Sequence, residues 1–351
     1  MKLDLEKIKQ RKIFLFLEFV GAKQRIIFLC FTSKHRKLMD KGTVIRTTGS
    51  HYTVKNSEGK EFECCIKGKF KISGIKSTNP IAIGDIVEFI PSDSTSYGLI
   101  CKIEQRKNYI IRKATKLSKQ THIIASNIDQ ALLIVTAVLP RTSTGFIDRF
   151  LLTCEAYKIP CILVFNKIDL YEEETRQYAD YLMSIYENIG YKCIETSAIE
   201  KTGLETLKEI LQDKTSLLSG HSGVGKSALI NAIDSNLNLK TSAISLSNLK
   251  GRHTTTFAQM FPLAFGGNII DTPGIKSFGM VDFAAEEVAR YYPEMRTRLS
   301  ECKYYNCTHI HEPDCAIKKA VENGESSQER YSNYINIVNG EEVQLEQWQT
   351  R

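Results

Sequence analysis

One eight-residue stretch constrains the fold of this chain more than any other. It reads Gly220-His221-Ser222-Gly223-Val224-Gly225-Lys226-Ser227 and matches the pattern G-x-x-x-x-G-K-S. The apolar run 216–218 before it suits a short buried strand, and the run 228–232 after it suits the start of a helix. Strand, glycine-rich loop and helix form the context in which this pattern binds phosphate. A chance match in a glycine- and serine-rich loop is the competing interpretation.

The backbone of such a loop explains its chemistry. Glycines allow successive N–H groups to curl around phosphate oxygens, and the helix N-terminus adds positive potential. Lys226 can reach the β- and γ-phosphates, and the Ser227 hydroxyl can ligate Mg²⁺. We expect the loop, together with Ala228 at the start of the helix, to bind the phosphates.

Length and charge set the broader limits. The 351 residues allow two or three domains, and the ten cysteines, scattered except near the C-terminus, suit a reduced cytosol better than a disulfide scaffold. The net charge is +7, and residues 1–40 and 41–115 each carry +6, so the basic excess lies in the N-terminal third. This asymmetry favours a polyanionic partner, although a merely soluble basic face would explain the charge equally well.

The first 41 residues are expected to be an N-terminal extension. Their apolar runs, 13–20 and 26–31, are shorter than the roughly 18 residues that span a bilayer, and no signal-peptide cleavage site is clear. Met39 directly precedes a strand pattern, which suggests the hypothesis that the natural start is Met39 and that the upstream part is disordered. Without a spanning segment or signal peptide, we expect a cytoplasmic protein that has no membrane partner. We also expect a monomer.

Two further regions differ in their patterns. Residues 42–113 contain about five short β-rich runs, which predicts a small barrel of the OB-fold type and raises the expectation of RNA binding. After a polar linker at 114–124, continuous apolar runs at 131–135 and 161–165 alternate with helical stretches. This alternation predicts an α/β domain with a mainly parallel sheet over 114–281, followed by a helical domain over 282–351.

Two motifs in the α/β region predict that the base is guanine. Asn166-Lys167-Ile168-Asp169 follows an expected strand, and the Asp169 carboxylate can accept from both N1–H and the 2-amino group of guanine. Asn166 can bond the ring edge, while the Lys167 stem can lie over the base. Ser197-Ala198 follows the next expected strand, where the Ala198 N–H would meet O6. A wrong base would leave such buried polar groups unpaired, which is costly.

The remaining motifs complete a GTPase site. Asp271-Thr272-Pro273-Gly274 follows an expected strand, so Asp271 would hold Mg²⁺ through water and the Gly274 N–H would sense the γ-phosphate. In the loop 251–256, Thr255 is our preferred further Mg²⁺ ligand. The base-reading motifs precede the phosphate loop, which reverses the usual order and predicts a circularly permuted GTPase domain. The γ-phosphate switch then leads directly into the C-terminal domain.

The combination of the barrel, the permuted GTPase and a segment with three cysteines and two histidines at 302–315 resembles the ribosome small-subunit-dependent GTPase (RsgA) family. The segments G-R-H-T-T-T (251–256) and D-T-P-G-I-K-S-F (271–278) carry the resemblance, which covers about residues 42–340. It implies a GTP hydrolase that acts in late assembly of the small ribosomal subunit and binds its rRNA through the OB and zinc domains. The subunit would stimulate hydrolysis of GTP to GDP and phosphate, and hydrolysis would be coupled to release.

The residue that positions the attacking water is less obvious. Ile275 stands where Ras-like enzymes carry a glutamine, and an isoleucine cannot orient water. His253 is the nearest candidate in sequence, and the resemblance also implicates it in hydrolysis on the ribosome. An exposed loop histidine or an RNA contact is the alternative. We expect His253, Lys226 and Thr255 to form the catalytic set.

A cysteine and histidine cluster lies near the C-terminus. Cys302, Cys307, His309 and Cys315 follow the spacing C-x4-C-x-H-x5-C, and three thiolates with one imidazole suit a closed, structural zinc site. His311 is a rival ligand, but the family spacing matches His309. Reduced cysteines in a core are the alternative, which the polar, turn-like stretch disfavours.

Two other functions fit parts of the pattern. An RNA-binding scaffold could use GTP only as a binding switch with negligible turnover, which Ile275 allows. A permuted GTPase could also serve a non-ribosomal partner, although the basic N-terminal third argues for RNA.

Overall fold

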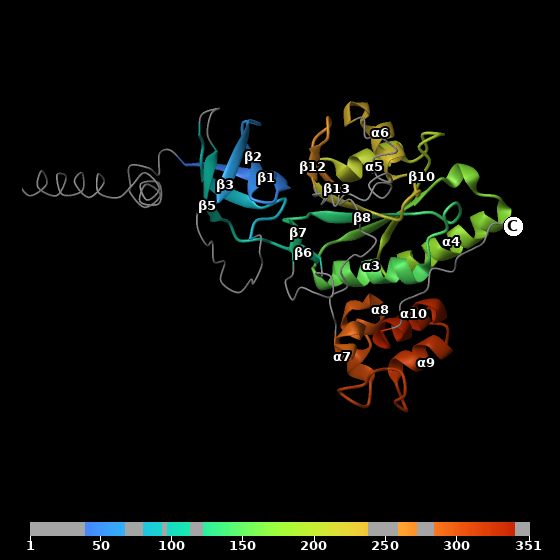
Figure 1. Cartoon of the computed structure of the whole chain (residues 1–351). Coiled ribbons are helices and arrows are strands. Elements are labelled where there is room, and N and C mark those ends of the chain that lie inside the picture. The colour runs from blue at the N-terminus through green and yellow to red at the C-terminus, as the bar shows by residue number, and fades with distance from the viewer. Residues whose placement is uncertain are drawn as a thin grey trace, which may run out of the picture.

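The computed structural model describes residues 39–66, 80–92, 97–112, 122–237, 259–271 and 284–340. A barrel, an α/β layer structure and a group of short helices follow one another along the chain (Figure 1). None of the helices in these ranges combines the length and the apolar character needed to cross a membrane.

The N-terminal barrel is closed. β1 pairs with both β2 and β4, β3 pairs with β5 in parallel, and β4 pairs with β5, so the ring runs β1-β2-β3-β5-β4 and returns to β1. Alternate residues of each strand point inward and fill the barrel with apolar side chains, among them Val44, Val54 and Phe89. The predicted OB-type barrel is therefore confirmed. Its strands are β1 (Asp40–Thr48), β2 (His51–Asn56), β3 (Glu61–Ile66), β4 (Ile86–Ile90) and β5 (Gly98–Ile103).

A small two-stranded sheet joins the barrel to the rest of the molecule. It consists of β6 (Tyr109–Arg112) and β7 (His122–Ser126), so β7 begins inside the predicted linker at 114–124. The buried carboxylate of Asp85 accepts hydrogen bonds from Arg106 Nη2 and from Ser126 Oγ, each at 2.6 Å. β1 also pairs with β12 of the main sheet. The barrel is thus tied to the α/β layers at two places.

The main sheet has the order β10-β9-β8-β11-β13-β12, and every described pairing among these strands is parallel except that of β12 with β13. The chain runs outward from β8 through β9 to β10, then returns to β11 on the other side of β8. This path confirms the permuted, mainly parallel sheet, and β8 and β11 form its topological switch point. The strands are β8 (Gln130–Val135), β9 (Cys161–Asn166), β10 (Lys192–Thr196), β11 (Thr215–Ser219), β12 (Gln259–Pro262) and β13 (Asn268–Asp271).

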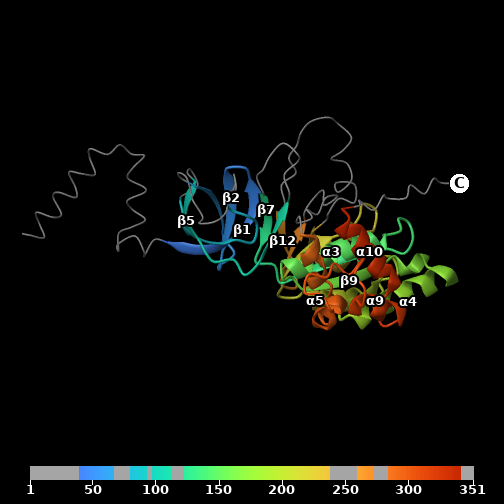
Figure 2. The same cartoon turned by 90° about the horizontal axis from the view of Figure 1, so that it is seen from below.

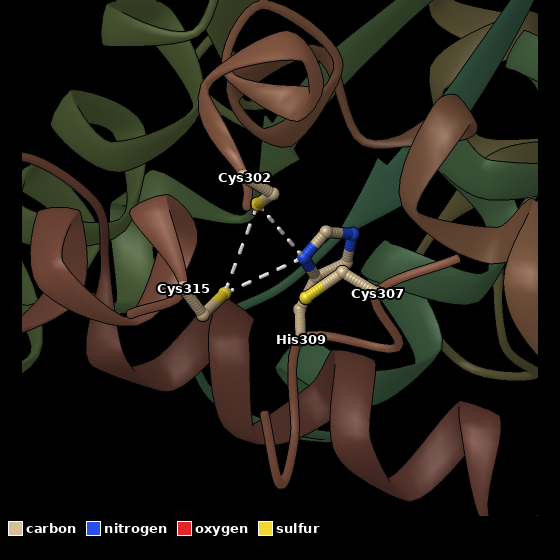
Figure 3. A group of neighbouring side chains, drawn as sticks. All are labelled: Cys302, Cys307, His309 and Cys315. Carbon is tan, nitrogen blue, oxygen red and sulfur yellow. Dashed lines mark hydrogen bonds between the residues drawn. The ribbon is translucent and has the colours of Figure 1, made fainter. Parts of the chain in front are cut away.

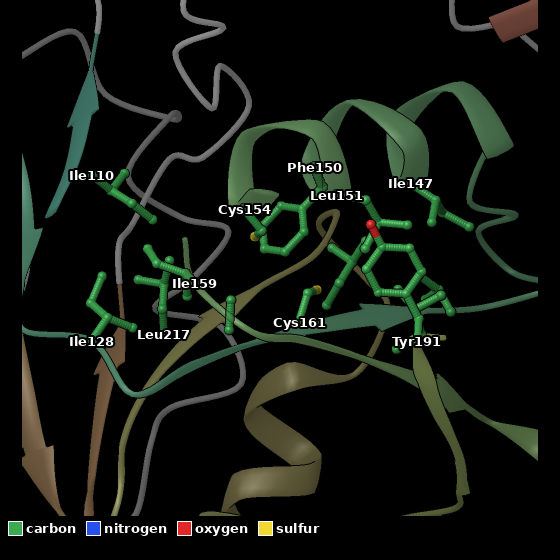
Figure 4. Close-up of a cluster of buried hydrophobic side chains, with 14 of the residues drawn as sticks. Ile110, Ile128, Ile147, Phe150, Leu151, Cys154, Ile159, Cys161, Tyr191 and Leu217 are labelled. Atoms are coloured by element: carbon green, nitrogen blue, oxygen red, sulfur yellow. The ribbon is translucent and has the colours of Figure 1, made fainter. Parts of the chain in front are cut away.

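Helices cover both faces of this sheet. Along β8, Leu133 and its alternate neighbours pack against α3 and α4, whereas Leu132 and Ile134 pack against α5 and α6. Figure 4 shows Phe150 and Leu151 of α3 within the first of these two clusters. A strand buried on both faces explains the continuous apolar run in the sequence. The helices are α3 (Thr144–Ala156), α4 (Glu173–Asn188), α5 (Leu204–Leu211) and α6 (Lys226–Ile233).

The C-terminal helices pack against α3 (Figures 1 and 2). A buried ionic cluster joins the two parts: Arg330 of α10 donates to Asp148 of α3 and to Glu294 of α8, the latter from Nε at 2.6 Å. Asn333 Nδ2 adds a 2.7 Å hydrogen bond to Asp148. Burial raises the pKa of Asp148 to about 6, although Arg330 acts to lower it. The helices are α7 (Ala285–Val288), α8 (Pro293–Arg296), α9 (Ala316–Glu322) and α10 (Gln328–Val338).

Candidate guanine nucleotide site and metal cluster

The predicted motifs follow strands whose carboxyl ends lie at one edge of the main sheet. The phosphate loop follows β11, the N-K-I-D motif begins at the last residue of β9, and Ser197 follows β10. Thr196 lies beside Asn166, and Asp271 lies beside Leu218, two residues before Gly220. Parallel strands therefore bring together segments far apart in sequence, at the switch point where open α/β sheets bind ligands.

The phosphate loop adopts the backbone that its glycines permit. Gly220, Gly223 and Gly225 have φ values of 144°, 87° and 94°, and α6 begins at the next residue, Lys226. A Cβ on Gly220 would lie 2.5 Å from the carbonyl oxygen of Ile134. The loop thus ends at the N-terminus of an eight-residue helix, which gives backbone N–H groups and a positive dipole end for phosphate.

Asn166 ties the base-reading motif to the phosphate loop. Its side chain is buried, Nδ2 donates to the Val224 carbonyl oxygen at 2.7 Å, and Oδ1 accepts from Thr196 Oγ1 at 3.1 Å. A Cβ on Gly225 would come within 2.4 Å of the same Nδ2. Because an amide nitrogen carries two hydrogens, Asn166 can hold the loop and still donate to a guanine ring. This structural role was not part of the sequence prediction.

Asp169 is held in place by the second base-reading motif. Ser197 Oγ donates to Asp169 Oδ1 at 2.6 Å and accepts from the Glu200 N–H at 3.0 Å. Ser197 is fully buried, whereas Asp169 and Ala198 are half-buried. The carboxylate thus has a fixed orientation at the edge of the protein, as selective hydrogen bonding to a base requires.

The two lysines of the site donate to backbone carbonyl oxygens of different segments. Lys226 Nζ donates to the carbonyl oxygens of Gly220 and His221, each at 2.7 Å, and so spans the phosphate loop. Lys167 has a left-handed backbone with φ of 64°, and its Nζ donates to the Leu139 carbonyl oxygen at 2.6 Å. The hydroxyl of Ser227 lies on the first turn of α6 in a largely buried residue. These positions suit contacts with phosphates, base and Mg²⁺, respectively.

No sequence motif marks the loop that connects β8 to α3 or the first turn of α3. The Phe146 ring, in that first turn, lies against the imidazole of His221, with centroids 3.9 Å apart. In the loop, the Pro140 ring would lie 3.4 Å from a Cβ on Gly223. Only their proximity to the phosphate loop shows that these two segments are relevant to the site.

Part of the predicted site lies outside the described residues. His253, Thr255 and Gly274 belong to this part, and for Asp271 the structure describes the backbone only. The assignments of the attacking-water residue and of two Mg²⁺ ligands therefore stay predictions.

The four predicted metal ligands form one cluster near the C-terminus (Figure 3). The ligand atoms of Cys302, Cys307, His309 and Cys315 all lie within 4.8 Å of one another. His309 Nδ1 is 3.5 Å from Cys302 Sγ and 3.4 Å from Cys315 Sγ. Three sulfurs and one imidazole nitrogen at these separations fit a single tetrahedral ion.

The chain around this cluster is fixed by hydrogen bonds. Tyr331 OH donates to the His309 carbonyl oxygen at 2.7 Å, and Glu312 accepts from the Thr308 N–H at 2.8 Å. Burial acts to raise the pKa of Glu312, but hydrogen bonds from Thr308 and Ile310 outweigh it and lower the pKa to about 2. Hydrogen bonds within the segment 308–312 and from Tyr331 therefore help to hold the shape of the chain around the four ligands.

Comparison with known proteins places these features in one family. Residues 103–281 match the family described as RsgA GTPase, and residues 41–100 match the RsgA N-terminal domain. A protein named small ribosomal subunit biogenesis GTPase RsgA from Flavobacterium johnsoniae is 54% identical over 304 residues, which are 86% of this chain and 93% of that protein. Its namesake from Phocaeicola vulgatus is 53% identical over 302 residues, 86% of this chain and 97% of that protein.

Two solved structures are also similar. YjeQ from Thermotoga maritima is 37% identical, with a TM-score of 0.70 and coverage of 86% of this chain and 98% of that one. YloQ, described as a circularly permuted GTPase, is 31% identical, with a TM-score of 0.67 and coverage of 88% and 97%.

Proposed function

Because this chain belongs to the RsgA GTPase family and is therefore a GTP-hydrolysing enzyme, we propose that it acts in the biogenesis of the small ribosomal subunit. The observation that carries the GTP-binding part of the proposal is the hydrogen bond from Asn166 Nδ2 to the Val224 carbonyl oxygen, which joins the predicted guanine motif to the phosphate loop. The names of the relatives supply the ribosomal role. Late assembly in the cytoplasm, as a monomer, is the setting that we propose.

Each site residue has a role in this proposal. Asp169, with Ser197 and the Ala198 N–H, would read the guanine base, and the amides of the phosphate loop would hold the phosphates. Lys226 would leave its carbonyl partners to meet the β- and γ-phosphates. Ser227, Thr255 and Asp271 would hold Mg²⁺, which neutralises phosphate charge when bound.

The attacking water is assigned to His253, because Ile275 has no group that can orient it. In the sequence, His253 lies between α6 and β12, outside the described residues. We propose that the ribosomal subunit places this histidine, which makes hydrolysis slow in its absence.

The OB domain and the C-terminal zinc domain would bind the ribosomal subunit. We propose a division into an extension (1–41), an OB domain (42–113), a permuted GTPase domain (114–281) and a zinc domain (282–351). The closed barrel and the basic N-terminal third support contact with rRNA. The Cys₃His cluster supports one structural zinc ion per chain, which would brace the surrounding turns.

Single-turnover hydrolysis of GTP, with and without purified small subunits, tests the proposal. We expect slow hydrolysis alone and strong stimulation by the subunits, with Lys226→Ala as the inactive control. Subunit binding should weaken steeply as salt rises, because contacts with RNA phosphates release counterions. Hydrolysis without any stimulation would favour a different partner. Binding of GTP with negligible turnover in both conditions would favour a scaffold that uses GTP only as a switch.

A further inference from the structure

The first turns of α3 lie between the C-terminal helices and the phosphate loop. Thr144 and Asp148 are four residues apart and therefore share one face of the helix, whereas Phe146 lies two residues from each and points to a different side. Thr144 and Asp148 contact α10, whereas Phe146 contacts His221. The same short segment thus contacts two parts of the molecule that differ in function.

The contacts on the C-terminal side are hydrogen bonds. Thr144 Oγ1 donates to Glu329 Oε1 at 2.9 Å and accepts from Asn333 Nδ2 at 3.3 Å. Asn333 also donates to Asp148 at 2.7 Å, and Asp148 is paired with Arg330. Because these groups are buried or half-buried, they fix where α10 sits on the helix.

The contacts on the other side involve the nucleotide site. The Phe146 and His221 rings lie 3.9 Å apart, centroid to centroid, at an interplanar angle of 32°. His221 is the second residue of the phosphate loop, and its carbonyl oxygen accepts from Lys226. Pro140, four residues before α3 begins at Thr144, lies next to Gly223, and the carbonyl oxygen of Leu139 accepts a hydrogen bond from Lys167 Nζ.

We propose that Phe146 is a positioning residue for the phosphate loop. Through this residue as a relay, a change in how α10 packs on α3 would alter the affinity of the site for the nucleotide. A shift of α10 moves the first turn of α3, and the ring contact passes this movement to His221. Binding of a partner by the C-terminal domain would then change nucleotide affinity without touching the site. This inference rests on the proposed role of the loop as the GTP site.

The test measures the affinity of the full chain for a fluorescent N-methylanthraniloyl derivative of GDP, together with its dissociation rate. Phe146→Leu removes the ring contact and should weaken binding by about 2- to 12-fold, the range that one aromatic pair is worth. Phe146→Tyr keeps the ring and should bind as the wild type does. Phe150→Leu is the matched control, since Phe150 lies on the same helix but in the apolar core. It should lower the melting temperature and leave the affinity unchanged.

Thr144→Val tests the relay without touching the ring. The change removes the hydroxyl that bonds to Glu329 and Asn333 of α10. It should weaken GDP binding, as Phe146→Leu does. The double variant should be no weaker than Phe146→Leu alone, because both changes interrupt one path. Ser332→Ala, on α10 but bonded only within that helix among the described contacts, is the control for the helix itself.

Each outcome decides the matter. If Phe146→Leu binds GDP as the wild type does, or if Phe150→Leu weakens binding equally, the positioning role is wrong. If Thr144→Val has no effect, or its effect adds fully to that of Phe146→Leu, the relay is wrong. If the wild type itself does not bind GDP, the proposed function falls and this inference falls with it.

Discussion

Replacing Arg330 by methionine should weaken the junction between the GTPase core and the C-terminal helices. The guanidinium is 3% exposed and pairs with two carboxylates, Asp148 at 0% and Glu294 at 10% exposure. Methionine fills much of the same volume, so the change removes the charge without opening a large cavity. Since it leaves two buried carboxylates without their cation, we expect a loss of about 3–5 kcal/mol in the free energy of unfolding.

The loss should depend on pH. Burial raises the pKa of Asp148 to about 6, above its unfolded value, so the folded state binds this proton more tightly. Such a group stabilises the fold most below the unfolded pKa, and that contribution disappears as pH rises through the folded pKa. Without Arg330 the folded pKa of Asp148 rises further. The variant should therefore lose much more stability at about pH 8 than at about pH 5, where the carboxyl can stay protonated.

Urea titration followed by circular dichroism measures both effects. Arg296→Met is the matched control, because Arg296 is 52% exposed and its 2.9 Å pair with Glu155 lies at the surface. That change should cost less than about 1 kcal/mol. Adding Asp148→Asn to Arg330→Met should remove most of the pH dependence. A loss for Arg330→Met as small as that for Arg296→Met, or one that is equal at both pH values, would refute this reasoning.

Three further changes test other parts of the molecule. Gly225→Ala should weaken GDP binding by at least about tenfold, since the φ of Gly225 is 94° and the new methyl group would lie 2.4 Å from Asn166 Nδ2. Gly190→Ala is the control, because Gly190 has a φ of 97° and open space around it, so this change measures the backbone strain without a clash. Cys307→Ser should release zinc, measured by elemental analysis, and loosen the C-terminal helices in hydrogen exchange; a full complement of zinc in the variant would contradict the ligand assignment. His253→Ala should abolish subunit-stimulated hydrolysis while GDP binding is retained, and normal stimulation would exclude the histidine from catalysis.

Sequence alone predicts most of the candidate nucleotide site, because each motif reflects a local requirement. Position 225 has a positive φ, which favours glycine. The carboxylate of Asp169 matches the donors of guanine, and this match depends on the side chain itself and not on its neighbours in the fold. The order of the motifs also predicts the permutation, and the strand order confirms it. Closely spaced ligands predict the metal cluster for the same reason, since Cys302 and Cys315 belong to one short segment.

Tertiary structure decided what no local pattern marks. Asp148 and Arg330 are 182 residues apart, and each reads in the sequence as an ordinary polar residue of a helix. Phe146 has the spacing of a core residue, and only the return of the chain to β11 brings His221 against its ring. A phosphate loop can be recognised from eight residues because its backbone chemistry is self-contained. Its coupling to the C-terminal helices depends on long-range packing, and packing partners leave no trace in local spacing.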